Sequence, residues 1–78
     1  MYSITTNDKK YTFTVTRHAR IGPNGRYFIW CLSELSELNK KGQYMRAKLI
    51  AQFGNTKNKE SFIYAKACAN ALCDAWNS

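Results

Sequence analysis

Few side chains in this sequence have types suited to catalysis or metal binding. His18 is the only histidine, and the three cysteines are Cys31, Cys68 and Cys73. Together they would supply the four ligands of a Cys₃His zinc site, but their spacing matches no standard zinc motif. The five acidic residues show no recognisable pairing for general acid–base chemistry. We therefore expect no enzymatic activity, no metal and no other cofactor, and we expect the thiols to be buried and reduced.

Basic and aromatic residues are the more informative set. The chain has 12 Lys and Arg against 5 Asp and Glu, a formal net charge of +7 on 78 residues. A basic excess on so small a protein indicates a polyanionic partner, nucleic acid first. Residues 25–31 read GRYFIWC, so a strand there would carry Arg26, Phe28 and Trp30 on one side. Its other side would carry Tyr27, Ile29 and Cys31.

The elements that must position these residues can be read from the pattern of the chain. Residues 2–6 form a short β-prone stretch, and residues 10–20 alternate cleanly between apolar and polar side chains. Residues 21–25 (IGPNG) are typical of a hairpin loop. A second long strand follows from residue 25. Residues 32–38 (LSELSEL) fit either a helical turn or a strand, and we favour a strand that ends in a turn at 39–42.

The last two elements are a further strand and a helix. Residues 43–53 alternate strictly, with Tyr44, Arg46, Lys48, Ile50 and Gln52 predicted to face outward. Their neighbours Met45, Ala47, Leu49, Ala51 and Phe53 are predicted to face the core, as are Tyr11, Phe13 and Val15. A helix then extends to about Trp76, capped by Thr56 or Asn58. Its apolar stripe comprises Phe62, Ala65, Ala69, Leu72 and Trp76.

The predicted fold is therefore α+β, in a single domain over residues 1–78. A three- or four-stranded antiparallel sheet is packed on one face by a single C-terminal helix, in the order β-β-β-β-α, with the first strand the least defined. One helix can cover only one face of such a sheet. The other face is left open for a ligand or another chain.

Three short motifs carry a resemblance to a known family: Gly25-Arg26-Tyr27, the pair Phe53 and Thr56, and the alanine-rich run from Ala67 to Ala75-Trp76. Over residues 10–76 they resemble the three-stranded-sheet-plus-helix DNA-binding domain of phage and transposon integrases and of plant ethylene-response factors. The resemblance implies that Tyr27, Ile29 and Cys31 face the helix. Phe28 and Trp30 would then lie on the open face.

The resemblance also implies an interface on that face. Cations there would contact phosphates, and Arg46 would be the candidate base reader because its guanidinium matches guanine bidentately. The candidate residues for binding nucleic acid or a protein partner are Thr14, Thr16, His18, Arg20, Arg26, Phe28, Trp30, Tyr44, Arg46 and Lys48. In the alternative register Phe28 and Trp30 belong to the core, and Tyr27 and Ile29 are the outward pair.

Three functions fit this sequence. The first is a small basic nucleic-acid-binding protein of phage or mobile-element type, with DNA favoured. The second is a phage-encoded inhibitor of the anti-CRISPR or host-takeover kind, which would dock on a nucleic-acid-handling protein complex. The third is a homodimer whose open faces pack together. No apolar run approaches the roughly 18 residues of a membrane span and no signal peptide is evident, so we expect the cytoplasm, or the host cytoplasm for a phage protein.

Overall fold

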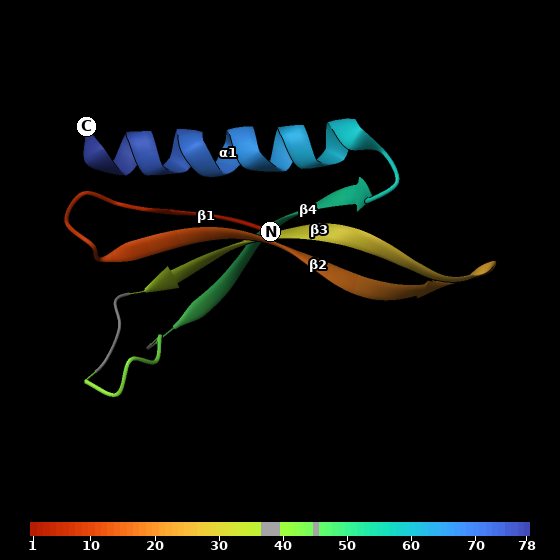
Figure 1. Cartoon of the computed structure of the whole chain (residues 1–78), viewed down its shortest axis with the longest axis horizontal. Helices are drawn as coiled ribbons and strands as arrows, with labels where there is room; N and C mark the ends of the chain where they lie inside the picture. Colours follow the sequence, from red (N-terminus) through yellow and green to blue (C-terminus); the bar gives the residue numbers. More distant parts are fainter. Residues whose placement is uncertain (37–39, 45) are drawn as a thin grey trace.

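The fold consists of one antiparallel sheet and one helix. In a computed structural model that describes residues 1–36, 40–44 and 46–78, the sheet has the strand order β1-β2-β3-β4. The strands are β1 (Tyr2–Thr5), β2 (Tyr11–Gly22), β3 (Gly25–Ser36) and β4 (Ala47–Asn55), and the helix is α1 (Lys59–Asn77). Figure 1 shows α1 lying along one side of the sheet, with no helix on the other side among the described residues. The α+β fold and the β-β-β-β-α order are confirmed.

The β2–β3 hairpin is the longest feature of the sheet, with 12 residues in each strand. Gly22 pairs with Gly25 across a two-residue turn formed by Pro23 and Asn24. Gly25 has a φ of 108°, a value that side chains with a Cβ rarely adopt. A Cβ at Gly22 would lie 2.9 Å from the Tyr27 ring, so glycine is needed here for a different reason, the close approach of the ring.

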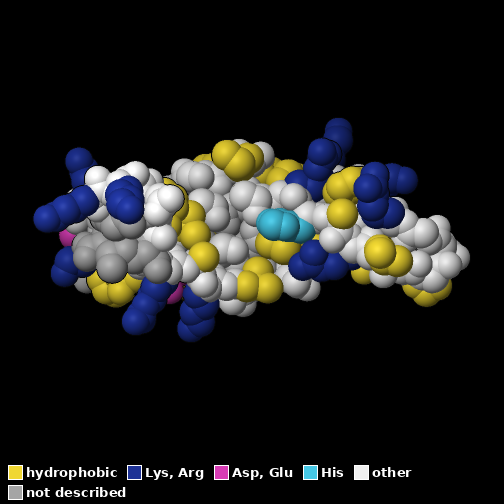
Figure 2. Space-filling view, turned by 90° about the horizontal axis from the view of Figure 1, so that it is seen from below, with side chains coloured by type: hydrophobic (Ala, Val, Ile, Leu, Met, Phe, Trp, Pro, Cys, Tyr) yellow, Lys and Arg dark blue, Asp and Glu magenta, His cyan; other side chains and the backbone are white. Residues whose placement is uncertain are grey.

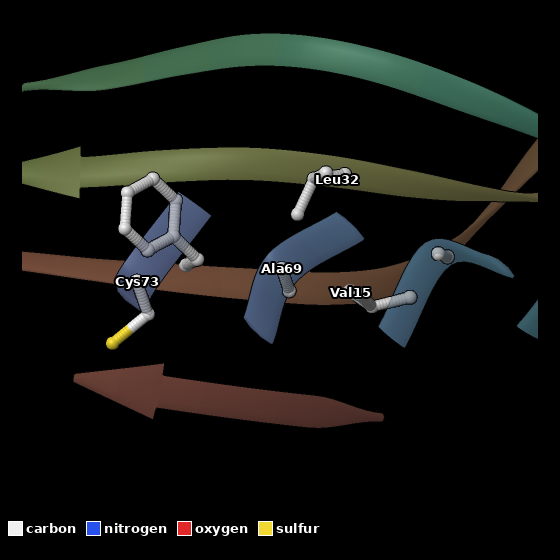
Figure 3. Close-up of a cluster of buried hydrophobic side chains, with 6 residues drawn as sticks. Val15, Leu32, Ala69 and Cys73 are labelled. Carbon is white, nitrogen blue, oxygen red and sulfur yellow. The ribbon is translucent and has the colours of Figure 1, made fainter. Parts of the chain in front are cut away.

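The core lies between α1 and the middle of the sheet (Figure 3). Phe13 and Val15 from β2 and Leu32 from β3 are buried there against Ala65, Ala69 and Cys73 of α1. The buried helix residues Ser61, Ala65, Ala69 and Cys73 recur every four positions and are all small. Small side chains on this stripe let the helix lie close to the strands.

The predicted helix stripe is largely correct, although its large residues lie at the margins of the contact. Phe62 and Leu72 are half-buried against the core, and Trp76 is 46% exposed. Asn58, one of the two residues proposed as the cap, is the N-cap, and its side chain accepts a hydrogen bond from the Glu60 backbone N–H. The cap satisfies one of the unpaired N–H groups at the start of the helix.

The turn between β1 and β2 ties the end of the helix to the sheet through Asp8. Its carboxylate accepts hydrogen bonds from the Thr6 hydroxyl at 2.7 Å, the Lys10 backbone N–H at 3.0 Å and the Trp76 indole N–H at 2.8 Å. These donors stabilise the charged form and lower the pKa of Asp8 to about 2, the Thr6 hydroxyl contributing most. The indole also packs edge-on against Tyr11, with ring centroids 4.5 Å apart.

β4 departs from the strict alternation predicted for it. Leu32 pairs with Ala51 but Ser33 pairs with Leu49, so Ile50 is an extra residue, a β-bulge. The bulge reverses the faces of β4 on its two sides. Ala51 and Phe53 face the helix as predicted, but Leu49 lies on the open face and is 51% exposed. The prediction that Ala47 and Leu49 face the core is therefore wrong.

Some predictions fall on residues that the structure does not describe. Met45, assigned to the core face, and residues 37–39, where the third strand was predicted to end in a turn, lie outside the described residues. The described part of this connection has a turn at Lys40 and Lys41, within the predicted range of 39–42.

Candidate functional site

The faces of β3 are the reverse of those implied by the family resemblance. Trp30 lies on the helix-covered side, with its ring 4.7 Å from the Phe62 ring of α1. It packs against the core formed by Phe13, Val15 and Leu32. Trp30 is therefore not a residue of the open face. Tyr27 and Ile29 lie on the side of β3 away from the helix, where Tyr27 is exposed and Ile29 is buried. This is the alternative register allowed by the sequence.

The most projecting part of the molecule is the tip of the β2–β3 hairpin, which we call the basic arm (residues 17–28). β1 pairs with β2 no further than Val15, and β4 pairs with β3 no further than Ile29. The pairs from Ala19–Phe28 to Gly22–Gly25 therefore form a two-stranded ribbon without a neighbouring strand on either side. Figure 1 shows this ribbon extending past the N-terminal end of α1.

The basic arm carries Arg17, His18, Arg20 and Arg26 and contains no Asp or Glu. On its helix-side face the Phe28 ring lies between two guanidinium groups, with the carbon centre of Arg17 at 4.9 Å and that of Arg26 at 5.4 Å from the ring centroid. Both arginines are exposed, so their charged groups remain available to an anionic partner while the ring orients them. Half-buried Phe28 thus acts as a support for two cations.

On the opposite, open face, the arm continues into a row of polar side chains from β2. Thr14 and Thr16 lie on this face, and Thr16 Oγ1 is 2.8 Å from His18 Nε2. Arg20 lies over Cys31, with Nη2 to Sγ at 3.8 Å, and donates from Nη1 to the Ala19 carbonyl. A shallow groove lies beside Arg20, lined also by Tyr27, Ile29 and Gln52. Figure 2 views this side of the molecule and shows Lys and Arg side chains gathered toward its two ends.

The predicted site residues from the fourth strand lie away from the arm. Arg46 and Lys48 line an open hollow at the other end of the molecule, together with Lys10, Tyr11 and Glu34. Lys48 pairs with Glu34, which pairs with Phe13, so Lys48 lies on the same side of the sheet as the helix, where it is exposed. The prediction that Arg46 and Lys48 share the open face is wrong, because the bulge at Ile50 reverses the strand there. Tyr44 precedes β4 and is 44% exposed.

The predicted site residues thus lie in several separate places rather than on one surface. Thr14, Thr16, His18 and Arg20 share the open face, whereas Arg26 and Phe28 lie on the other side of the same arm. Arg17 was missed by the sequence reasoning. The missed signal is simple, because the alternation that places Tyr11, Phe13 and Val15 on one face also places Arg17 there.

The three thiols are free, with Cys31 and Cys73 buried and Cys68 exposed on the outer side of α1. The prediction that all three are buried is therefore wrong for Cys68. Across residues 1–36, 40–44 and 46–78, no group of three or more His, Cys, Asp or Glu side chains is placed to hold a metal ion.

No protein-family model, curated protein or solved structure gives a significant match to this chain. Among the described residues, no helix has the length and apolar character needed to cross a membrane.

Proposed function

We propose that this protein binds duplex DNA through the basic arm. The observation that carries the proposal is the projecting basic arm, residues 17–28, which holds three arginines and a histidine with no acidic residue among them. Cations on such a ribbon neutralise phosphates, and the release of counterions from the DNA drives binding. Because Phe28 already orients Arg17 and Arg26 in the free protein, these side chains lose less conformational entropy when DNA binds.

Duplex DNA is favoured over duplex RNA on geometric grounds. Two-stranded ribbons enter either the major or the minor groove of B-form DNA, whereas duplex RNA closes the first of these routes because its major groove is too deep and narrow for side chains to read. On the tip side of Val15 and Ile29 the sheet is only two strands wide. No other strand therefore blocks the entry of the ribbon into a groove.

Fluorescence anisotropy with a labelled 20-base-pair duplex, repeated over a range of salt concentrations, tests the proposal. The affinity of the native protein is expected to fall steeply with salt. Arg17→Ala, Arg20→Ala and Arg26→Ala should each weaken binding and reduce the slope of log K against log salt by about one unit, the value for one lost phosphate contact.

Arg46→Ala is the matched control, because it removes the same charged group from the opposite end of the molecule. It should change the affinity and the salt slope less than any arm variant. A larger effect of Arg46→Ala than of the arm variants would place the interface at the hollow and contradict the arm. Absence of salt-dependent binding to the duplex would contradict the proposed function itself.

The alternative function, a protein-binding inhibitor, was based on Phe28 and Trp30 together on an open face. Trp30 instead packs against Phe62, which removes half of that support. If the protein were such an inhibitor, a pull-down from host lysate should still capture a protein partner after nuclease treatment. A DNA-binding protein should lose such co-purifying material when the nucleic acid is digested.

A further inference from the structure

Ile21, at the tip of the basic arm, is 90% exposed, the highest value among the large hydrophobic side chains of the described residues. It lies two positions before Pro23, which is itself exposed at the turn. Ile21 contributes nothing to the core, and the tip has no neighbouring strand against which it could pack. The fold gives no reason for a large apolar side chain at this point.

The charges around Ile21 indicate what kind of partner would accept it. Arg26 is its direct cross-strand partner, and Arg20 precedes it on the opposite face of the ribbon. The apolar tip thus has an arginine next to it on each face of the ribbon, with the Arg26 guanidinium over the Phe28 ring and the Arg20 guanidinium over Cys31. A partner that suits this arrangement presents anionic groups on both sides of an apolar layer, and duplex DNA does so with its phosphates and stacked bases.

We propose that Ile21 acts as a wedge that enters a base-pair step from the minor groove and kinks the duplex. This inference rests on the proposed function, DNA binding by the arm. Proteins that bind the minor groove often insert an isoleucine, leucine or proline side chain between base pairs, which unstacks the step and bends the DNA by roughly 20–90°. Arg20 and Arg26 would hold the phosphates on the two sides while the tip enters, so the positive charge supplies affinity and Ile21 supplies the distortion.

Two fluorescence readouts on a 20-base-pair duplex with a central, easily unstacked TA step test the wedge. A donor and an acceptor at the duplex ends report bending, and 2-aminopurine in place of adenine at that step reports unstacking. The native protein should raise both the energy transfer and the 2-aminopurine emission. Ile21→Ser should lose most of both signals and keep the salt slope of binding, because no charge has changed.

Two further variants make the comparison specific. Ile63→Ser removes the same side chain from an exposed position on α1, where Ile63 is 60% exposed, and it should leave both signals at the native level. Ile21→Leu keeps an apolar tip and should retain most of the kink. Circular dichroism of Ile21→Ser should match that of the native protein, since the side chain is almost fully exposed and lies outside the core.

The outcomes separate the wedge from the function on which it rests. If the native protein binds the duplex with a salt-dependent affinity but neither signal rises, the wedge is refuted and the proposed function stands. If Ile21→Ser bends and unstacks the duplex as the native protein does, the wedge is also refuted. If no variant binds the duplex and Ile21→Ser instead loses a protein captured from nuclease-treated lysate, both proposals fail and the tip is a protein contact.

Discussion

Trp30 and Tyr27 are three residues apart in the same strand but face different surroundings. Trp30 packs against Phe62 and the core, whereas Tyr27 is 41% exposed and lies over Gly22. Trp30→Ala should therefore lower the free energy of unfolding by about 3 kcal/mol, as for large aromatic truncations in cores. Tyr27→Ala should lower it by less than about 1 kcal/mol. Urea denaturation followed by circular dichroism measures both.

A third variant tests the surroundings of the Trp30 indole. Its Nε1 is buried and has no hydrogen-bond partner among the described residues. Trp30→Phe removes that polar atom while keeping an aromatic ring near Phe62, so it should cost clearly less than Trp30→Ala. An equal or larger loss for Tyr27→Ala than for Trp30→Ala would mean that the register of β3 is reversed.

Asp8 gives the stability of the fold a definite dependence on pH. Its pKa is lowered to about 2 from 3.8, first by the Thr6 hydroxyl and then by the Lys10 N–H and the Trp76 indole. A lowered folded-state pKa means that its contribution is present above pH 3.8 and is lost as the pH falls toward 2. Asp8→Asn should therefore have a lower Tm than the native protein at pH 7. The difference should shrink between pH 4 and pH 2.

Thermal unfolding of both proteins across this range provides the measurement. Because the other carboxyl groups titrate in both proteins, their effects cancel in the difference between the two Tm values. A difference that stays constant down to pH 2 would show that the Asp8 charge does not contribute as its hydrogen bonds indicate.

At the scale of the element, α1 presents one thiol to solvent and one to the core. Cys68 is exposed, whereas Cys73 is 1% exposed and Cys31, under Arg20, is 3% exposed. In the native protein one thiol should react quickly with a disulfide reagent such as DTNB, and three should react after denaturation. Cys68→Ser should abolish the fast phase. Fast reaction of Cys73 would contradict the packing of α1 on the sheet, whereas fast reaction of Cys31, which lies on the open face, would contradict its burial under Arg20.

The elements themselves were largely predictable from the sequence, but the faces of two of them were not. The alternation in β2, the turn residues at 22–25 and the spacing of Ala65 and Ala69 each indicate one structure, and the fold agrees with all three. In β4 the predicted alternation placed Ile50 outward, but Leu49, Ile50 and Ala51 are three consecutive apolar residues, and the bulge at Ile50 reverses the faces of the strand at this point. In β3 both faces are apolar, so only the packing of Trp30 against Phe62 decides between them.

The candidate site depended on these faces and was therefore predictable only in part. Thr14, Thr16, His18 and Arg20 follow from the alternation of β2 alone, and they do share one face. Arg46 and Lys48 were placed with them by extending the period across the bulge. Their separation from the arm follows from how β4 pairs with β3. The sequence of one strand does not give the register of that pairing.

At the scale of the whole molecule, the principal-axis extents of 43 × 27 × 15 Å describe an elongated body with the basic arm at one end. The arm lacks flanking strands and core contacts at its tip, so its local opening should cost less free energy than opening the centre of the sheet. Amide hydrogen exchange should therefore be faster at Arg20 and Arg26 than at Val15 and Leu32. Duplex DNA should slow the exchange of the arm selectively, and slowing centred on Lys48 instead would contradict the arm as the interface.

The contacts between the β1–β2 turn and the end of α1 also constrain the order in which the chain can fold. Asp8 with Trp76, and Asn7 with Asn77, join residues 68 and 70 positions apart, whereas the β2–β3 hairpin closes across two residues. Closing a loop of 70 residues instead of 10 costs about 1.7 kcal/mol more in chain entropy. Strands joined by short connections can therefore pair early, and the last turn of α1 docks late. Mutations at Trp76 should then mainly speed unfolding, whereas mutations at the hairpin turn should mainly slow folding.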